Sequence, residues 1–428
     1  MNIALQTDSP AHQAALEPQQ IRAAVTEEIA NISVLDVHTH LFMPSLPGLN
    51  QWGIDDLVTY HYLEAELFRF SDITPEDYWA LPKRHQADAI WRALFVDNVP
   101  LSEATRGVIA VLESFGLPVT SPDLSEARAF FSAQSLDAHI DKVFTLAGVS
   151  RVVMTNDPLD PEEGPLWEAG AAADSRFLPV LRLDRILNRW PQHWAVLAEQ
   201  GYAVDDCASG KSTGEVRRFL DAWFARMQPV YMAVSLPDTF QYPEDSLRAR
   251  LLRDAVLPAC REYRIPLSLM MGVRYQVNPR LKLGGDAVGR ADLRALERLC
   301  AYHSENRFLA SVLSRENQNE LVVYARKFSN LMPFGCWWFM NNPSIVEEIT
   351  RERIEMLGTS FIPQHSDARI LEQLIYKWRN TRRTMAPILS NSYALLAEDG
   401  RAVTRQEIRG DVNRLFRGNL EKFAGITV

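Results

Sequence analysis

The feature that most constrains the fold is a series of eight short runs of β-branched and apolar residues. These runs cover Val34–His38, Ser150–Thr155, Phe177–Leu183, Val230–Leu236, Ile265–Met271, Arg307–Leu313, Asn330–Cys336 and Gly358–Pro363. Most are separated by stretches with helical periodicity, and eight strands alternating with helices are typical of a closed parallel barrel. The sequence therefore predicts an α/β fold, a (β/α)8 TIM-type barrel. A doubly wound open sheet is the alternative, but no Gly-x-Gly-x-x-Gly turn follows any run.

The segment between the first two runs departs from this alternation. Residues 50–145 contain no convincing strand, and their helical patterns are interrupted by proline and glycine. The predicted helices are Ile54–Phe70, Pro75–Ala80, His85–Phe95, Ser102–Phe115 and Ser125–Ala133. We therefore predict a barrel domain over 34–428 with a helical insertion subdomain at 50–145, preceded by an N-terminal lead-in, residues 1–33, with a helix over 11–30.

Charge and composition limit the classes of partner. A net charge of −9 and a pI near 5.6 argue against a general binder of nucleic acids or anionic membranes. No run approaches the roughly 20 apolar residues of a membrane span, and the first 33 residues lack a signal-peptide core. The cysteines Cys207, Cys260, Cys300 and Cys336 lie too far apart for a thiolate zinc motif. We expect a cytoplasmic protein that forms a homo-oligomer.

Two histidines and one aspartate are candidate metal ligands. His38 and His40 lie two residues apart at the end of the first run, so both side chains point to the same side of a strand. Asp367 follows the eighth run, which neighbours the first in a closed barrel. Two imidazoles and a carboxylate match a catalytic zinc site. Alternatively, the histidines are core residues and Asp367 caps a helix predicted over 368–383.

The predicted site holds one divalent ion, zinc or another metal. The ends of the fourth, fifth and sixth runs offer Ser235, Met270 and Ser314, none of which is a strong ligand for such a cation. The sequence therefore favours one metal per chain.

Three arginines at or just after strand ends predict an anionic substrate. Arg182, Arg274 and Arg369 can each make paired hydrogen bonds to a carboxylate. The ordinary alternative is surface salt bridging, and Arg369 could simply pair with Asp367 two residues away.

Two aromatic clusters are candidates for the walls of the pocket. Trp337 and Trp338 follow the seventh run, where aromatic faces suit the C–H face of a sugar. Tyr60, His61 and Tyr62 lie in the insertion, from which a tyrosine could donate to substrate or take part in proton transfer. Core packing is the alternative for each of these side chains.

Taken together, these motifs resemble the uronate isomerase (glucuronate isomerase) family of the amidohydrolase superfamily. The resemblance runs through most of the chain. It rests on Asp36-Val37-His38-Thr39-His40-Leu41-Phe42, Thr59-Tyr60-His61-Tyr62-Leu63, Thr155-Asn156-Asp157-Pro158, Leu181-Arg182-Leu183-Asp184, Phe334-Gly335-Cys336-Trp337-Trp338-Phe339 and Ser366-Asp367-Ala368-Arg369.

The resemblance implies a metal-assisted aldose–ketose isomerase. Its substrates would be hexuronates, with D-glucuronate converted to D-fructuronate and D-galacturonate to D-tagaturonate through an enediol. The implied residues are His38, His40 and Asp367 for the metal, Tyr62, His61, Arg182 and Arg369 for substrate, and Trp337 or Trp338 for the pocket lining. Many members have a histidine where this chain has Met270, so a role for the fifth strand in metal binding or proton transfer is not expected.

Asp367, Tyr62 and Arg369 are the predicted catalytic residues. Asp367 is the leading base, although it could instead act in ring opening while Tyr62 or a metal-bound water serves the C–H step. Arg182 and Arg369 would anchor the carboxylate, and arginine or tyrosine donors would stabilise the enediolate. The alternatives are a mononuclear metal-dependent hydrolase of sugar acids, such as a lactonase, and a sensor that binds sugar acids without catalysis.

Overall fold

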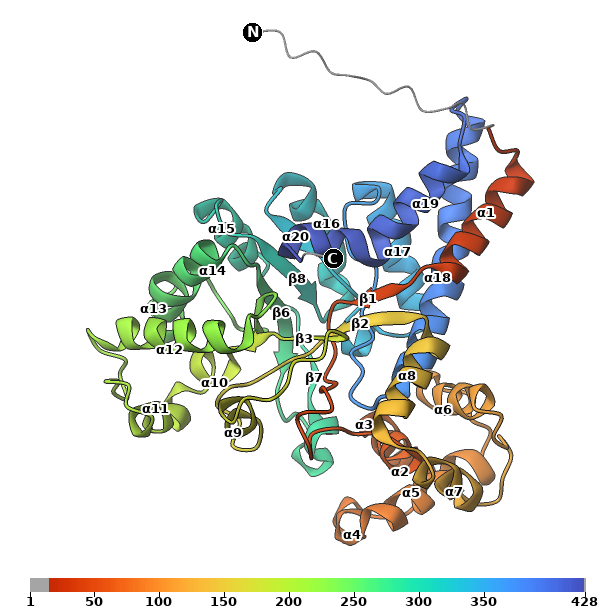
Figure 1. Ribbon diagram of the computed structural model, residues 1–428, viewed down its shortest axis with the longest axis horizontal. Coiled ribbons are helices and arrows are strands. Elements are labelled where there is room, and N and C mark those ends of the chain that lie inside the picture. Colours follow the sequence, from red (N-terminus) through yellow and green to blue (C-terminus); the bar gives the residue numbers. More distant parts are fainter. Residues whose placement is uncertain (1–14, 427–428) are drawn as a thin grey trace.

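The computed structural model describes residues 15–426 as a parallel β-barrel surrounded by helices, with a helical insertion beside it (Figure 1). The parallel strands pair in the order β1-β2-β3 and β4-β5-β6-β8-β9. They are β1 Val34–Asp36, β2 Val149–Val153, β3 Phe177–Leu178, β4 Leu181–Arg182, β5 Met232–Pro237, β6 Leu267–Arg274, β8 Phe308–Val312 and β9 Leu331–Pro333. β8 is buried at every position, as expected for a parallel strand covered on both faces.

Short bridges join the two sets of strands into a closed barrel. Asn156, just after β2, forms an isolated parallel bridge with Leu181 of β4. The run predicted at 177–183 is therefore two short strands, and Pro179, which cannot donate a ladder hydrogen bond, lies between them.

The barrel closes through a segment that is less regular than predicted. The prediction of a full strand over Gly358–Pro363 is wrong, since only Ile362 bridges to Phe334 in this stretch. A few residues later the Asp367 N–H donates to the His38 carbonyl at 3.2 Å. This backbone contact places the end of the eighth segment beside β1, so the open-sheet alternative is excluded.

The insertion consists of helices that gather below the barrel in Figure 1. They are α2 Ile54–Val58, α3 His61–Phe70, α4 Pro75–Ala80, α5 Lys83–Trp91, α6 Glu103–Ser114, α7 Ser125–Ser132 and α8 Leu136–Ala147. The single helix predicted over 54–70 is broken, because the Thr59 hydroxyl bonds back to the Asp55 carbonyl at 2.7 Å and Tyr60 takes an extended backbone. As a result, a new helix begins at His61. The division into lead-in, barrel and insertion domains stays a prediction.

The remaining barrel helices follow the strands in alternation. They are α9 Glu163–Glu168, α10 Asp184–Leu187, α11 Trp190–Glu199, α12 Ser212–Met227, α13 Leu247–Leu251, α14 Leu257–Tyr263, α15 Arg294–Tyr302, α16 Gln318–Lys327 and α17 Pro343–Leu357. α17 shows how the local sequence sets a boundary. Pro343 occupies its first turn and the Asn342 side chain accepts from the Ile345 N–H at 3.3 Å.

The first described helix packs against two helices from the C-terminal part of the described chain, beside the barrel. α1 Pro18–Asn31 lies along α18 Gln373–Glu398 and α19 Arg405–Asn413, and α20 Asn419–Ala424 ends the described chain (Figure 1). Residues 11–14 of the predicted lead-in helix lie outside the described residues. The helix predicted over 368–383 begins only at Gln373, so Asp367 is not its N-cap.

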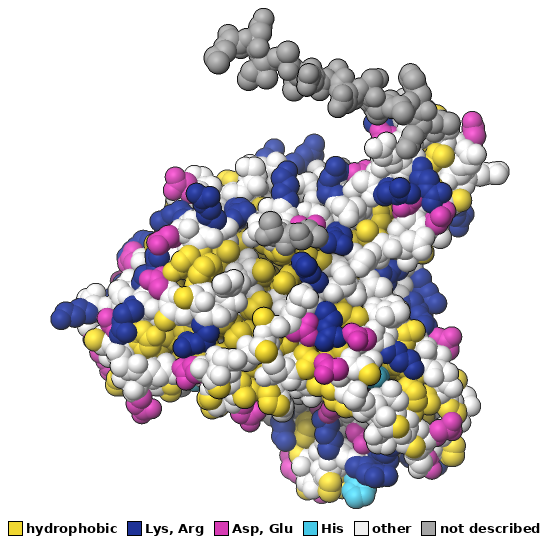
Figure 2. All heavy atoms as spheres, in the orientation of Figure 1, with side chains coloured by type: hydrophobic (Ala, Val, Ile, Leu, Met, Phe, Trp, Pro, Cys, Tyr) yellow, Lys and Arg dark blue, Asp and Glu magenta, His cyan; other side chains and the backbone are white. Residues whose placement is uncertain are grey.

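Figure 2 shows the outer surface in the same view. Apolar side chains gather in the middle of this face, over the barrel, while charged side chains of both signs are interspersed around its edge. Within residues 15–426, no helix combines the length and the apolar character that spanning a membrane requires.

Candidate active site

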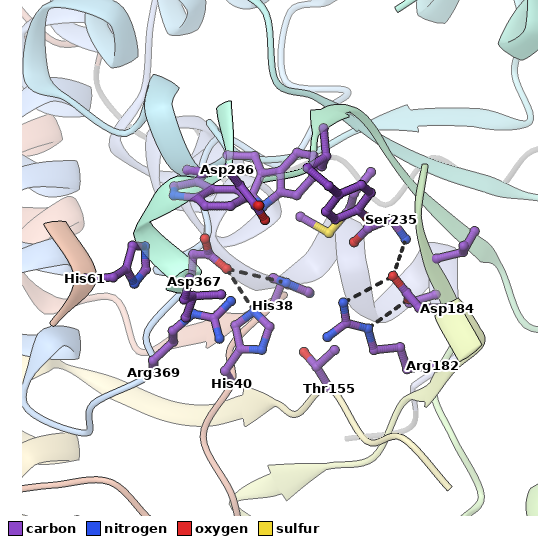
Figure 3. Close-up of a pocket in the computed structure, with 18 of the residues that line it drawn as sticks. His38, His40, His61, Thr155, Arg182, Asp184, Ser235, Asp286, Asp367 and Arg369 are labelled. Carbon is purple, nitrogen blue, oxygen red and sulfur yellow. Dashed lines mark hydrogen bonds and ion pairs between the residues drawn. The ribbon is translucent and has the colours of Figure 1, made fainter. Parts of the chain in front are cut away.

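His38, His40 and Asp367 meet at one end of the barrel, as predicted (Figure 3). The Nε2 atoms of His38 and His40 lie 3.5 and 3.4 Å from Asp367 Oδ1. One ligand atom from each residue lies within 4.8 Å of the other two. A second backbone contact, from the His40 N–H to the Ala368 carbonyl at 2.7 Å, holds the two segments in register.

Buried polar groups beneath the site fix the orientation of the first strand. Asp36 accepts hydrogen bonds from the Ser366 N–H at 3.2 Å and from Trp378 Nε1 at 2.9 Å. The Tyr231 hydroxyl donates to the Val37 carbonyl at 2.7 Å and lies 3.5 Å from His38 Nδ1. Since that hydroxyl hydrogen is already engaged, His38 Nδ1 is the donor in this pair, which leaves the lone pair of Nε2 facing Asp367.

The site is electrostatically arranged for neutral imidazoles around an ionised carboxylate. Burial lowers the pKa of His40 to about 4, and the nearby Arg369 guanidinium contributes in the same direction. Burial likewise lowers the pKa of His38 well below its usual value. Burial opposes ionisation of Asp367, but the neighbouring His40, His38 and His365 side chains outweigh it and hold the pKa of Asp367 below its ordinary value.

These residues fit a divalent cation. Asp367 Oδ1 is buried and receives no hydrogen bond from any described residue. An unpaired buried carboxylate oxygen is costly, and a cation held between it and two imidazole nitrogens would satisfy it. Two nitrogen ligands and one oxygen ligand suit zinc and leave a coordination position for water or substrate.

The triad opens into a cavity of about 590 Å³, the reaction cavity. The side chains that line it include His38, His40, His61, Thr155, Arg182, Asp184, Arg189, Ser235, Met270, Tyr275, Gln276, Lys282, Asp286, Trp337, Trp338, Asp367 and Arg369. Most of the predicted site residues are thus brought together. The exceptions are Tyr62 and Arg274, which do not line the cavity.

The two arginines in the cavity differ in their partners. Arg182 is held by Asp184, with Nε 2.8 Å from Oδ2 and Nη2 3.2 Å from Oδ1. Arg369 lies on the other side of the histidines (Figure 3), and its guanidinium has no hydrogen bond or ion pair with any described residue. The alternative in which Arg369 pairs with Asp367 is therefore wrong. Arg274 is more than half exposed and faces Asp238 at 4.0 Å, away from the cavity.

Both predicted tryptophans line the cavity. Trp338 stacks on Phe339 at 4.7 Å between ring centroids, and its Nε1 is buried without a partner among the described residues. His61 stands edge-on to Trp338 at 5.9 Å and also has a buried, unpartnered Nε2. Both nitrogens therefore belong to side chains of the cavity wall and lack a partner in the described protein. A bound ligand can form hydrogen bonds with them.

Tyr62 lies behind this wall, in contact with the His61 ring at 4.7 Å. Burial, together with the neighbouring Tyr60, raises the pKa of Tyr62 well above its usual value. Tyr62 is therefore a neutral phenol that can donate a hydrogen bond, and its catalytic role stays a prediction.

A loop after β6 covers the cavity and contributes residues that the sequence patterns missed. Lys282 lies in the segment Pro279–Gly285, and Asp286 lies between this segment and the short strand β7 Ala287–Val288, which pairs antiparallel with β6. Trp79 of α4 secures this loop, since its Nε1 donates to the Arg280 carbonyl at 2.8 Å and Lys282 Nζ lies 4.0 Å from its ring centre.

Neither Lys282 nor Arg189 directly follows a strand, so a search of strand ends could not find them. Asp36 was missed for a different reason. An acidic residue inside an apolar strand, directly before the histidine pair, was an available signal for a buried supporting carboxylate.

Comparison with known proteins decides the family. Neither a family model nor a curated protein matches the sequence. A solved uronate isomerase from Bacillus halodurans C-125 is 48% identical, with a TM-score of 0.95, over 97% of this chain and 98% of that one. The chain belongs to the uronate isomerase family. This confirms the resemblance and favours an isomerase over the lactonase alternative.

Two more distant uronate isomerase structures share the fold. The enzyme from Thermotoga maritima aligns with a TM-score of 0.74 at 16% identity, covering 96% of this chain and 98% of that one. The glucuronate isomerase from Caulobacter crescentus aligns with a TM-score of 0.68 at 14% identity, covering 98% and 96%. The predicted TIM-type barrel is thereby confirmed.

Proposed function

We propose that this uronate isomerase family member interconverts D-glucuronate with D-fructuronate, and D-galacturonate with D-tagaturonate. The observation that carries the proposal is a His-His-Asp triad in the same cavity as an unpaired arginine, Arg369, in a chain 48% identical to a uronate isomerase. A divalent-metal site beside an anion-binding group suits the reaction of a sugar acid at its carbonyl end.

The arginines bind the substrate carboxylate. The Arg369 guanidinium has no partner in the described chain and faces the cavity, so a carboxylate there gains a paired hydrogen bond without breaking another. Arg182 is already held by Asp184, which orients its remaining N–H groups toward the cavity. Trp338 Nε1 and His61 Nε2 supply further hydrogen bonds to sugar hydroxyls.

Asp367 moves the proton. Its Oδ1 faces the two histidines, whereas its other oxygen points away from them (Figure 3) and is free to take a proton. Its low pKa favours the ionised form that a base requires. In the aldose-to-ketose direction the sugar ring opens, the C2 proton is removed, and an enediol is protonated at C1.

His38, His40 and Asp367 would hold one divalent cation, and we propose zinc. When bound, such an ion supplies Lewis-acid polarisation of the substrate oxygens at the carbonyl end. Neutral imidazoles, which burial favours here, are the form that binds a metal. Homo-oligomer formation and cytoplasmic location stay predictions from the sequence.

The test is incubation of the purified protein with D-glucuronate or D-galacturonate in deuterated water, followed by NMR. Formation of the ketose from either acid, with deuterium at C1, supports isomerisation through an exchanging base. A ketose without deuterium still supports isomerase activity but assigns a shielded proton or hydride shift. Absence of ketose from both acids, in a sample whose metal content is one ion per chain, contradicts the proposal.

A further inference from the structure

A second cavity of about 440 Å³, the side chamber, adjoins the reaction cavity. Arg182, Asp184, Arg189 and Tyr275 line both spaces. The two cavities therefore share a wall that contains the Arg182–Asp184 ion pair. It is large enough for a second molecule of the size of a monosaccharide acid.

The lining of the side chamber is positively charged, although the whole chain is negative. It carries four arginines, Arg182, Arg185, Arg189 and Arg248, and two carboxylates, Asp157 and Asp184. Both carboxylates are already used, because Asp184 binds Arg182 at 2.8 Å and Asp157 lies 3.0 Å from Arg185. Two arginines remain with spare capacity.

Those two arginines face the chamber with few competing partners. Arg189 has no hydrogen bond or ion pair with the side chain of any described residue. Arg248 uses Nε to bind the Leu187 carbonyl at 3.2 Å, while its nearest carboxylate, Glu244, is 4.0 Å from Nη1. The terminal nitrogens of Arg248 can therefore bind an anion without losing a close ion pair.

One residue of the lining, Asn188, carries an unpaired acceptor. Asn188 donates from Nδ2 to the Ser235 carbonyl at 2.7 Å, which fixes its amide, and its Oδ1 is buried without a described partner. An anion alone offers no hydrogen to this oxygen. A ligand that combines a carboxylate for the arginines with a hydroxyl for Asn188 satisfies both features.

We propose that the side chamber is a second binding site for a hydroxylated carboxylate, and that it holds a second hexuronate beside the one in the reaction cavity. The identity of this ligand rests on the proposed function, since a hexuronate has the required carboxylate, hydroxyls and size. The site would keep the next substrate molecule, or a departing product, next to the shared wall of the two cavities.

Equilibrium dialysis with radiolabelled D-glucuronate tests the proposal. Wild-type protein should bind two labelled molecules per chain at saturation, counted after substrate and product have equilibrated. Arg248→Glu should weaken the second binding step at least about tenfold, the scale expected when a charged hydrogen bond is replaced by repulsion. Arg248→Lys, which keeps the positive charge, should retain two.

The matched control is Arg250→Glu, which makes the same charge change on the exposed side of α13, outside the side chamber. It should still bind two molecules. Arg248→Glu should also keep the wild-type kcat at saturating substrate. A single molecule per chain in the wild type, or a second binding step in Arg248→Glu as tight as in the wild type, overturns the proposal. These outcomes are separate from failure of the proposed function, which is absence of ketose from both acids.

Discussion

Asp367 combines its chemical role with an uncommon backbone conformation. Its φ is 53°, in the left-handed region that only glycine, asparagine and aspartate enter at low cost. This conformation occurs two residues before Arg369, so both side chains reach the same cavity from one short loop. The residue type is thus constrained by the backbone as well as by the chemistry.

Asp367→Asn should abolish turnover and leave the fold intact. Asparagine tolerates the left-handed conformation but removes the negative charge from the predicted metal ligand and base. With metal removed from both proteins, we expect the free energy of unfolding to stay within about 1 kcal/mol of wild type, as measured by urea denaturation. Asp367→Ala, which loses that tolerance, should be less stable than Asp367→Asn by about 1 kcal/mol. Near-normal activity in Asp367→Asn would contradict the assignment.

Gly335 makes room for the His365 ring behind the metal triad. An added Cβ would lie 1.8 Å from His365 Cδ2, in a residue whose φ is +64°. His365 in turn stands edge-on to His38 at 5.3 Å between ring centroids. A side chain at position 335 therefore displaces a ring that packs against a predicted ligand.

Gly335→Ala should destabilise the protein by about 3 kcal/mol or more, from overpacking and backbone strain together. The comparison is Gly425→Ala, where φ is +70° and an added Cβ meets nothing within 4 Å. That variant should lose only about 1–2 kcal/mol of unfolding free energy, because it has the backbone strain without the overpacking. If urea denaturation gave the same loss of unfolding free energy for both variants, the clash with His365 would make no contribution to the destabilisation.

At the scale of elements, the insertion is joined to the barrel by buried polar contacts. Glu372, which precedes α18, accepts from the Gly53 N–H at 2.9 Å and lies 2.7 Å from His139 Nε2 of α8. Gly53 precedes α2, so one carboxylate holds both the beginning and the end of the insertion. This contact ties both ends of the insertion, which carries His61, to the residue that precedes α18.

Within the insertion, Glu64 of α3 predicts a pH-dependent stability. Burial raises the pKa of Glu64 to about 7, and the Tyr78 hydroxyl donates to it at 3.1 Å. The folded protein thus keeps a proton that the unfolded chain releases near its ordinary pKa of 4.5. The stabilisation is complete below pH 4.5 and is lost as the pH rises through 7.

Glu64→Gln should therefore be more stable than wild type at high pH. The advantage should grow by roughly 2 kcal/mol between pH 5 and pH 8, because glutamine remains neutral and still accepts from Tyr78. Urea denaturation at the two pH values measures it. Exposed Glu126→Gln is the control and should show no such trend. A pH-independent difference for Glu64→Gln would rule out titration of Glu64 as the cause.

At the scale of the whole molecule, the metal site joins the first and last segments of the barrel. His38 and His40 follow β1 directly and Asp367 follows the last barrel segment, so a bound ion would link residues far apart in sequence. A ligand that binds only the folded state stabilises it by mass action. Metal binding should thus act on the stability of the entire barrel.

Removal of metal by a chelator should lower the melting temperature, and added Zn²⁺ should restore it. At a free Zn²⁺ concentration 100 times the dissociation constant, the gain is about 2.7 kcal/mol. Calorimetry of chelated and reloaded protein measures the shift. Asp367→Asn should show a much smaller one, and an equal shift in this variant would locate the effect at another metal site.

Much of this molecule was predictable because it depends on local patterns. Alternating apolar runs and helical periodicity specify the barrel, since burial of parallel strands requires continuous apolar segments. The spacing of His38 and His40 predicts a shared side of a strand, and barrel closure predicts Asp367 as their neighbour. Each of these features can be predicted without knowledge of any tertiary contact.

Tertiary structure alone decided which charges are paired and which face a cavity. In the sequence, Arg182, Arg274 and Arg369 all lie at or just after predicted strand ends. In the structure, however, Arg182 is held by Asp184, Arg274 faces outward, and Arg369 is unpaired inside the site. Irregular segments, such as the single bridge at Ile362 and the loop carrying Lys282, likewise form through long-range contacts. The periodicity of apolar residues indicates which positions along the chain are buried. The pairing of a charged side chain depends instead on groups that are distant in sequence, and only the folded molecule brings these groups together.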